Sequence, residues 1–283
     1  MNMRRWSLAL MTVSLVAGMA GALWAQTPGV DRFTVPLSDP ARPGTVKVSL
    51  IAGNISVKGY AGKEVIVEAR ARDEEESHRE ERPKSQGLKR IPNLTTGLTV
   101  EEEDNVITIS TGAIQRPVDV ILQVPLRTSL RLKSVNDGDI RVEQVQGEIE
   151  VGNINGSVTL QQVSGSVVAN AHNEDLKVTL ASVEPNKAMS FTSFNGDVDV
   201  TLPADVKATL AMKTDQGEIF SDFDIKIEST AGKPVTETAK EKGARFRVQM
   251  DKTVRGTING GGPEFQFKTF NGAIYIRKAV PSK

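Results

Sequence analysis

The 283-residue sequence contains no cysteine, which excludes both a disulfide framework and a cysteine-linked lipid anchor. Aromatic residues make up only 5 % of the chain and there are two histidines, so neither a serine–histidine–aspartate set nor a cysteine nucleophile is credible. The formal net charge is zero, and no overall field points to nucleic acid or to an anionic membrane. Convincing helical periodicity is absent after residue 25, which leaves an all-β chain.

The first 25 residues differ in character from the rest. A short basic stretch is followed by an apolar run that ends in small residues at Ala25, after which the chain turns polar. This order predicts a secretory signal peptide over residues 1–25. An uncleaved membrane anchor is the alternative, because the apolar run approaches the ~20 residues that span a bilayer. We therefore expect one exported domain over residues 26–283, in the periplasm, on the cell surface or outside the cell, with no integral membrane span after cleavage.

A short phrase recurs every nine residues between positions 134 and 180. Apolar residues follow each corner two and four places later, and mostly polar residues stand between them, which predicts a half-buried strand of about five residues. Asn or Asp before Gly is expected to supply the positive φ of a tight corner. Two units, about 18 residues, then make one coil. The coils are expected to stack in parallel, because a single unit buries too little apolar surface to be stable alone. The corner positions are Gly138, Gly147, Gly156, Gly165 and Glu174.

The pattern extends beyond this block. Residues 53–60, 194–200, 215–221 and 270–276 fit the same template. Gly196 follows Glu174 by 22 residues and Gly217 follows Gly196 by 21, which predicts successive full coils with small loop insertions. Further strands are expected at 46–50, 65–69, 98–100, 106–110, 118–124, 129–133, 206–212, 223–227 and 246–250.

A third inward position is predicted just before each corner, occupied in turn by Val145, Ile154, Val163, His172, Phe194 and Phe270. A histidine here could be a ligand or a pH switch, but a hydrogen-bonded corner histidine is the preferred interpretation. The two phenylalanines are interpreted as core plugs rather than as platforms for stacking sugars.

Two segments do not fit the repeat. The mixed-charge insert at about 70–97 could hold a metal or a polyanion, but its opposite charges alternate evenly, so a solvated excursion is preferred. Residues 229–244 are expected to form a second surface loop.

The stretches VPLRTSLRLKSVNDGDIRVEQVQGEIEV, SFNGDVDVTLPADVKATL and GGPEFQFKTFNGAIYIRK resemble the bacterial "putative adhesin" family of unknown function, which has serial N-G-[DN]-[IV]-x-[IV] corners. The resemblance covers most of residues 26–283 and is best from Val118 to Arg277. It implies a single-stranded, right-handed parallel β-solenoid of the β-helix or β-roll type in the cell envelope or outside it. It implies no catalytic residue. The sequence departs from the family pattern at His172–Glu174, where glycine is lost.

The sequence favours neither a calcium site nor a catalytic site. A calcium-binding β-roll needs oxygen ligands in every turn, but the positions equivalent to Asp137 and Asp139 do not keep the charge. Asp197 and Asp199 could form a pair of catalytic carboxylates on one strand, yet alternating charges are typical of any solvated strand. We therefore expect no metal, no cofactor and no enzymatic activity, with a polysaccharide-acting β-helix enzyme as the less favoured class.

The preferred function is a binding scaffold, that is, an adhesin-like envelope or surface protein that uses one face of the solenoid. Side chains of successive coils line up on such a face, and the candidate row is Arg141, Thr159 and Lys177, beside Glu143, Gln161 and Thr179. An envelope glycan or a membrane or surface protein is the expected partner, and nucleic acid is not. The alternative is a periplasmic accessory of envelope-stress signalling.

Overall fold

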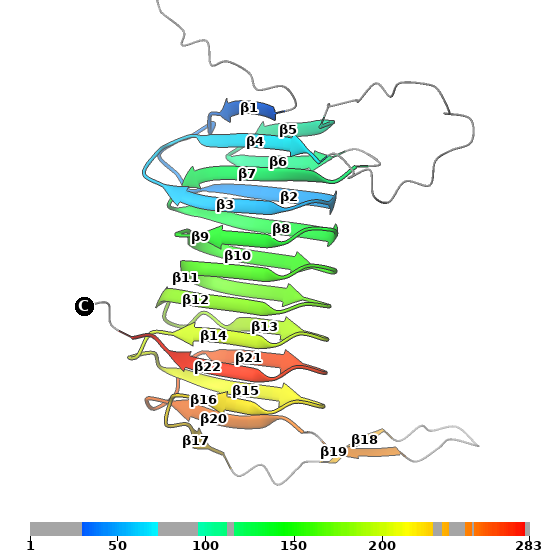
Figure 1. Cartoon of the computed structure of the whole chain (residues 1–283). Coiled ribbons are helices and arrows are strands. Elements are labelled where there is room, and N and C mark those ends of the chain that lie inside the picture. The colour runs from blue at the N-terminus through cyan, green and yellow to red at the C-terminus, as the bar shows by residue number, and fades with distance from the viewer. Residues whose placement is uncertain are drawn as a thin grey trace, which may run out of the picture.

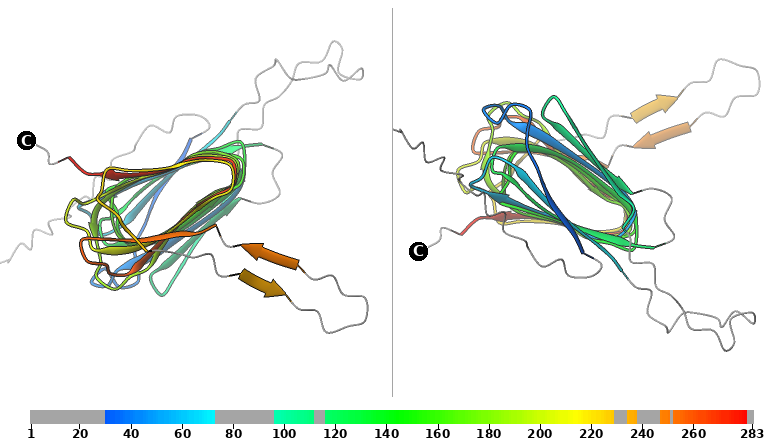
Figure 2. Two further views of the ribbon diagram at one scale, coloured as in Figure 1. Left: turned by 90° about the horizontal axis from the view of Figure 1, so that it is seen from below. Right: turned by 90° about the horizontal axis from the view of Figure 1, so that it is seen from above.

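The computed structural model describes residues 30–72, 96–111, 116–228, 234–237, 247–250 and 252–280. These residues form strands, turns and bends, without a helix. None of them therefore builds a helix of the length and apolarity that crossing a bilayer requires. Twenty strands join into one continuous sheet that winds into a tall stack of coils (Figure 1), and end-on views show each coil as a flattened ring (Figure 2). The chain is a mostly parallel β-solenoid.

Each coil contributes one strand to each of two broad faces. Face 1 contains, in spatial order, β1 (Val30–Val35), β4 (Val65–Ala71), β7 (Val118–Pro125), β3 (Ile55–Tyr60), β9 (Ile140–Glu143), the first part of β11 (Val158–Ala171), β12 (Leu176–Val183), β14 (Val198–Leu202), β22 (Ile274–Lys278) and β16 (Ile219–Ser221).

Face 2 contains β5 (Leu98–Glu103), β6 (Val106–Thr111), β2 (Gly44–Ala52), β8 (Thr128–Asn136), β10 (Gln146–Asn153), the second part of β11, β13 (Met189–Ser193), β21 (Glu264–Thr269), β15 (Ala208–Thr214), β20 (Val254–Ile258) and β17 (Lys226–Ile227). A separate hairpin, β18 (Pro234–Glu237) with β19 (Arg247–Met250), projects away from the stack (Figure 2).

Alternation places apolar side chains inside. Val158 pairs with Ile140 on one side and with Leu176 on the other, and all three side chains are completely buried. Burying each contributes ~1.5–3 kcal/mol. Partners in successive coils of this region are 18, 19 or 22 residues apart, so the coil length varies along the stack. Other partners are 76 residues apart, because their coils are not consecutive in the sequence.

Two coils are placed out of sequence order. The coil β21–β22 lies between β13–β14 and β15–β16, so Gly217 stacks on Gly272 rather than on Gly196. At the other end, β2–β3 lies between β6–β7 and β8–β9. The expectation that Gly196 and Gly217 begin adjacent coils is therefore wrong, because the C-terminal coil takes the intervening level.

Antiparallel strands close both ends of the stack. At one end β1 and β4 pair antiparallel with their neighbours and β5 pairs antiparallel with β6. At the other end β20 pairs antiparallel with β15 and β17. Such pairs cover the open edges of a parallel stack, which could otherwise pair with another chain.

Most predicted strands are present within their expected bounds, but the strand at 223–227 is not. Its only extended part is β17, in which Ile227 is exposed, whereas Phe223 is buried. The signal segment 1–25 and most of the insert at 70–97 lie outside the described residues. Of the expected loop at 229–244, the structure describes only β18.

Candidate functional site

The predicted row on face 1 is assembled as expected in space. Thr159 pairs with Arg141 and with Lys177, and the row continues to Asp199 and Tyr275. Beyond Lys177, the side chains of the row contact one another and Arg277. Arg277 donates to Asp199 over 2.8 Å and lies over the ring of Tyr275. This ion pair raises the pKa of Arg277 above its ordinary value. The structure brings the predicted residues together without defining a ligand for them.

The aspartates of the corner leading into face 1 support the backbone. Asp139 accepts hydrogen bonds from the backbone N–H and the hydroxyl of Ser157 in the next coil, both at 2.9 Å. Asp197 accepts from the N–H of Ala273 over 2.7 Å. Each carboxylate thus joins one coil to the next. The described residues contain no cluster of three or more His, Cys, Asp or Glu side chains that could hold a metal ion.

The interpretation of Phe194 and Phe270 as core plugs is wrong. Both side chains point outward, and so do Ile154 and His172, whereas Val145 and Val163 are buried as predicted. The six positions belong to two kinds of corner. Val145 and Val163 lie where the chain passes from face 1 to face 2, and the other four lie at the opposite corner, where face 2 passes into face 1.

At this second corner, polar side chains occupy the inside. Thr269 donates to the carbonyl of Gly196 in the neighbouring coil over 2.9 Å and accepts from the N–H of Gly272. Thr214 and Ser193 make the same two contacts at their own corners. An apolar side chain could not satisfy these buried backbone groups. This row was not predicted from the sequence, although a Ser or Thr three places before the glycine marks it.

The outward side chains form a continuous column, which we call the apolar ladder. Backbone hydrogen bonds and strand register place its members on six consecutive coils. The five apolar members are 37–52 % exposed. The rings of Phe194 and Phe270 lie parallel with centroids 5.0 Å apart, and His172 stacks on Phe194 at 5.2 Å. The ladder consists of Ile51, Val135, Ile154, His172, Phe194 and Phe270.

A second column, the asparagine ladder, runs beside the first. Each amide after Asn136 donates to the amide oxygen of the neighbouring coil over 2.6–2.9 Å. The apolar ladder continues through His172 and the asparagine ladder through Asn173, so the loss of glycine at this corner interrupts neither. The asparagine ladder consists of Asn136, Asn155, Asn173, Asn195 and Asn271.

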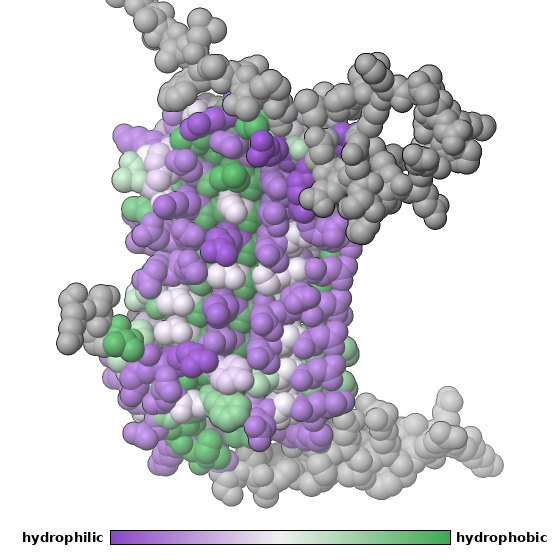
Figure 3. All heavy atoms as spheres, in the orientation of Figure 1, coloured by the Kyte–Doolittle hydropathy of each residue, from purple (hydrophilic) through white to green (hydrophobic). Residues whose placement is uncertain are grey.

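Seven other large hydrophobic side chains of the described residues are exposed, but they are scattered over the faces, corners and ends of the stack. Figure 3 shows hydrophilic side chains over most of this view, with hydrophobic atoms in a band down the middle and in patches at the edges. An ordered run of exposed apolar side chains on successive coils is therefore a distinctive surface. Contiguous exposed apolar patches mark interaction sites more often than scattered single residues do. The two ladders together are the candidate binding site.

Comparison with known proteins identifies relatives. A family model described as Toastrack DUF4097 matches residues 33–259. No curated protein matches the chain. A "putative cell adhesion protein" from Clostridium sporogenes is 12 % identical with a TM-score of 0.44, covering 88 % of this chain and 100 % of that one. A "putative adhesin" from Bacteroides fragilis is 11 % identical with a TM-score of 0.33, covering 88 % and 97 %. Neither likeness is close enough to transfer a function.

Proposed function

This chain belongs to the Toastrack DUF4097 family, a domain family of unknown function, and from that premise we propose that it is a non-enzymatic, exported binding scaffold of the cell envelope. The apolar ladder and the asparagine ladder together form its binding surface. The single observation that supports this role is the outward orientation of five apolar side chains and His172 on six consecutive coils. The right-handed sense of the coil and its regular length of about 18 residues stay predictions.

The dimensions of the surface favour a thin, extended ligand. Five steps between coils at ~4.8 Å give a length of about 24 Å. The ladder is one side chain wide, so its area is on the order of a few hundred Å², whereas a stable protein interface buries ~800 Å² on each partner. A linear polymer can touch every coil without needing a wide contact.

The hydrogen-bonding capacity of the surface favours a ligand that contains amides. An asparagine amide has two N–H donors and two acceptor positions, and each inner member of the asparagine ladder uses one donor and one acceptor for its neighbours. A donor and an acceptor per coil are left for a ligand, beside an apolar side chain. An N-acetylated glycan presents an amide and a methyl group on each sugar, which matches this pairing. We therefore propose that such a glycan is the ligand.

The carboxylates considered for catalysis are engaged in structural contacts, which supports a binding role. Asp199 pairs with Arg277 at 2.8 Å and Asp197 holds the backbone of Ala273. No feature of the described residues favours the signalling alternative.

Titration of the full chain with the linear hexamer of N-acetylglucosamine, followed by calorimetry, tests this proposal. We expect saturable binding, and roughly tenfold weaker binding by the double variant Phe194→Ser, Phe270→Ser, since two apolar contacts are lost. The hexamer of glucose, which lacks the acetamido groups, is expected to bind at least as weakly. Phe220→Ser is the matched control, because Phe220 is equally exposed but lies on face 1 against Tyr275.

Equal binding by the parent chain and the double variant would contradict the proposed surface. Equal affinity for the two hexamers would contradict the proposed recognition of acetamido groups. Circular dichroism of each variant confirms that the coils remain folded, so that a loss of binding is assigned to the surface.

A further inference from the structure

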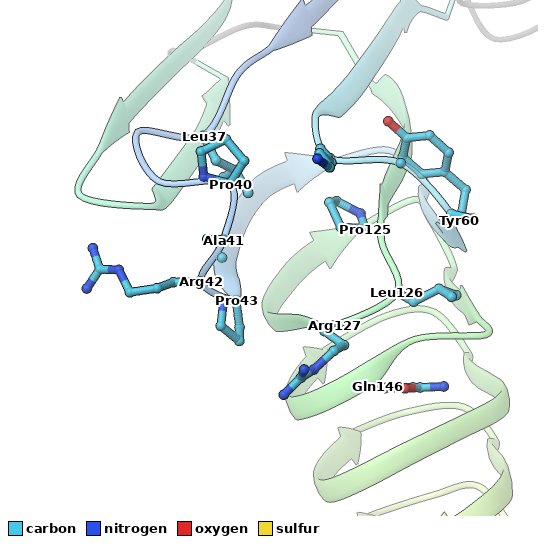
Figure 4. A pocket seen from close by; sticks show the side chains of 14 residues that line it. Leu37, Pro40, Ala41, Arg42, Pro43, Tyr60, Pro125, Leu126, Arg127 and Gln146 are labelled. Carbon is cyan, nitrogen blue, oxygen red and sulfur yellow. The ribbon is translucent and has the colours of Figure 1, made fainter.

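The corner opposite the ladders contains a pocket near the N-terminal end of the stack. Three turns build it: the loop before β2, the turn after β3 and the tight connection between β7 and β8. Its volume is about 330 Å³, within the ~300–1,000 Å³ range of small-molecule sites. Figure 4 shows Leu37, Pro40 and Pro43 on one side, facing Pro125, Leu126 and Tyr60 on the other. We call this hollow the corner pocket.

The walls of the corner pocket are apolar and held in place. Prolines fix the backbone of both walls. The hydroxyl of Tyr60 donates to the carbonyl of Glu64 over 2.8 Å, and the ring packs so closely on Gly62 that a Cβ atom there would lie 2.1 Å from it. The N–H of Leu126 donates to the carbonyl of Tyr60 over 3.1 Å. A preformed pocket loses little conformational entropy when a ligand enters.

The charges around the corner pocket have one sign. Its lining contains Arg42, Lys63 and Arg127 and no acidic side chain. Arg42 is paired with Asp39 at 2.9 Å, and its side chain points away from the pocket in Figure 4. Lys63 and Arg127 have no hydrogen-bond or ion-pair partner among the described residues. Arg127 starts at the rim and extends away from the apolar walls in Figure 4, on the side of an adjoining hollow that it also lines. Two cations are thus available at the rim of an apolar cavity.

The two carboxylates of the adjoining hollow form no ion pair with Arg127. Glu148 and Glu184 both line that hollow together with Arg127, and Glu184 acts on the charge of Lys187. Glu148 accepts from Lys187 over 2.9 Å. This pairing lowers the pKa of Glu148 and raises the pKa of Lys187, so each charge is already satisfied by the other. Among the described residues, neither Lys63 nor Arg127 therefore has an ion pair that a ligand would have to break.

We propose that the corner pocket binds an anionic amphiphile, with a carboxylate or phosphate held by Lys63 and Arg127 and an apolar stem between the proline walls. A guanidinium and an ammonium both form charge-assisted hydrogen bonds with such anions. The apolar walls indicate that the ligand has an apolar stem, because a simple inorganic anion would leave these walls exposed to water. This site is separate from the ladders and does not depend on the glycan proposal.

Fluorescence titration with 1-anilinonaphthalene-8-sulfonate, an apolar anion, tests the site on the full chain. We expect roughly tenfold weaker binding by the double variant Lys63→Gln, Arg127→Gln, because two charge-assisted contacts are lost. The uncharged N-phenyl-1-naphthylamine is expected to bind both chains equally. Arg141→Gln is the matched control for a lost surface cation, and Phe194→Ser with Phe270→Ser shows that the dye is not on the apolar ladder.

Two further arms identify the natural source of the anion. Displacement of the dye by decanoate but not by decanol indicates a free amphiphilic acid. Co-sedimentation with phosphatidylglycerol vesicles, lost in the Lys63→Gln, Arg127→Gln variant, indicates a lipid headgroup. The proposal is overturned if that variant binds the dye as the parent chain does, if Arg141→Gln weakens binding equally, or if decanol displaces the dye as well as decanoate.

Discussion

Replacing Val158 or Leu160 with aspartate is expected to unfold the stack. Both side chains are completely buried in the middle of the solenoid, between coils on either side. An unpaired carboxylate at either position has no partner inside and no access to water. The loss of stability should exceed about 4 kcal/mol, a range that only buried charges and comparable lesions reach. Circular dichroism and urea unfolding measure it.

Thr159 provides the control, since it lies between these two residues on the same strand with its side chain on the outer face. Thr159→Lys should change the free energy of unfolding by less than ~0.5 kcal/mol, as is usual for surface substitutions. If Thr159→Lys destabilises the protein as much as Val158→Asp does, the assignment of inward and outward positions is wrong.

Gly156→Ala is expected to cause the second largest loss of stability. A Cβ atom on Gly156 would lie 2.0 Å from the carbonyl oxygen of Gly138 in the neighbouring coil, so two coils would have to separate at that corner. Overpacking costs ~1–3 kcal/mol where side chains can adjust, and a backbone obstacle cannot adjust, so we expect at least about 3 kcal/mol. Thermal and urea unfolding measure the change.

Gly152→Ala is the matched control, four residues earlier in the chain. A Cβ atom on Gly152 has no other atom within 4 Å, so alanine fits there without a clash. We expect no loss of stability, since alanine restricts the unfolded chain more than glycine does. Similar losses for the two variants would contradict the clash with the neighbouring coil as the reason for glycine at position 156.

The same comparison explains what the corner glycines do. Sequence analysis expected positive φ at these corners, and Gly165 has it, at 110°. Gly156 and Gly272 do not, yet a Cβ on either would overlap a carbonyl of the adjacent coil. Close approach between coils is a property of the stacked state, so the sequence of a single unit does not reveal it.

The middle of the fold was predictable because its contacts are regular in sequence. Alternation of apolar and polar residues placed Ile140, Val158 and Leu176 in one buried row, as the structure has them. The stacking order of the coils toward the two ends was not predictable, because a coil inserted out of sequence order has the same repeat pattern as any other coil. By sequence, the FNG corner of residues 270–276 could stack next to Gly196 as well as the corner at Gly217 could. Only the pairing of β22 with both β14 and β16 decides between them.

The candidate site was misassigned for a different reason. The rule that apolar residues point inward fails where the backbone itself needs a buried hydrogen-bond partner. Ser193 and Thr269 take the inside of their corners for this purpose, and strand alternation then turns Phe194 and Phe270 outward. The sequence contained the signal in its SFNG and TFNG corners, where a hydroxyl residue directly precedes the phenylalanine.

Labelling of single cysteines tests the central claim most directly, and the cysteine-free chain makes this experiment simple. The repeat predicts equivalent positions for Ile154 and Val163, but Ile154 is 45 % exposed on the ladder and Val163 is completely buried. The account predicts that Ile154→Cys reacts rapidly with a maleimide in the native protein and is protected by the N-acetylglucosamine hexamer, while Val163→Cys does not react. Slow reaction at position 154, or reaction there that the hexamer leaves unchanged, would contradict it.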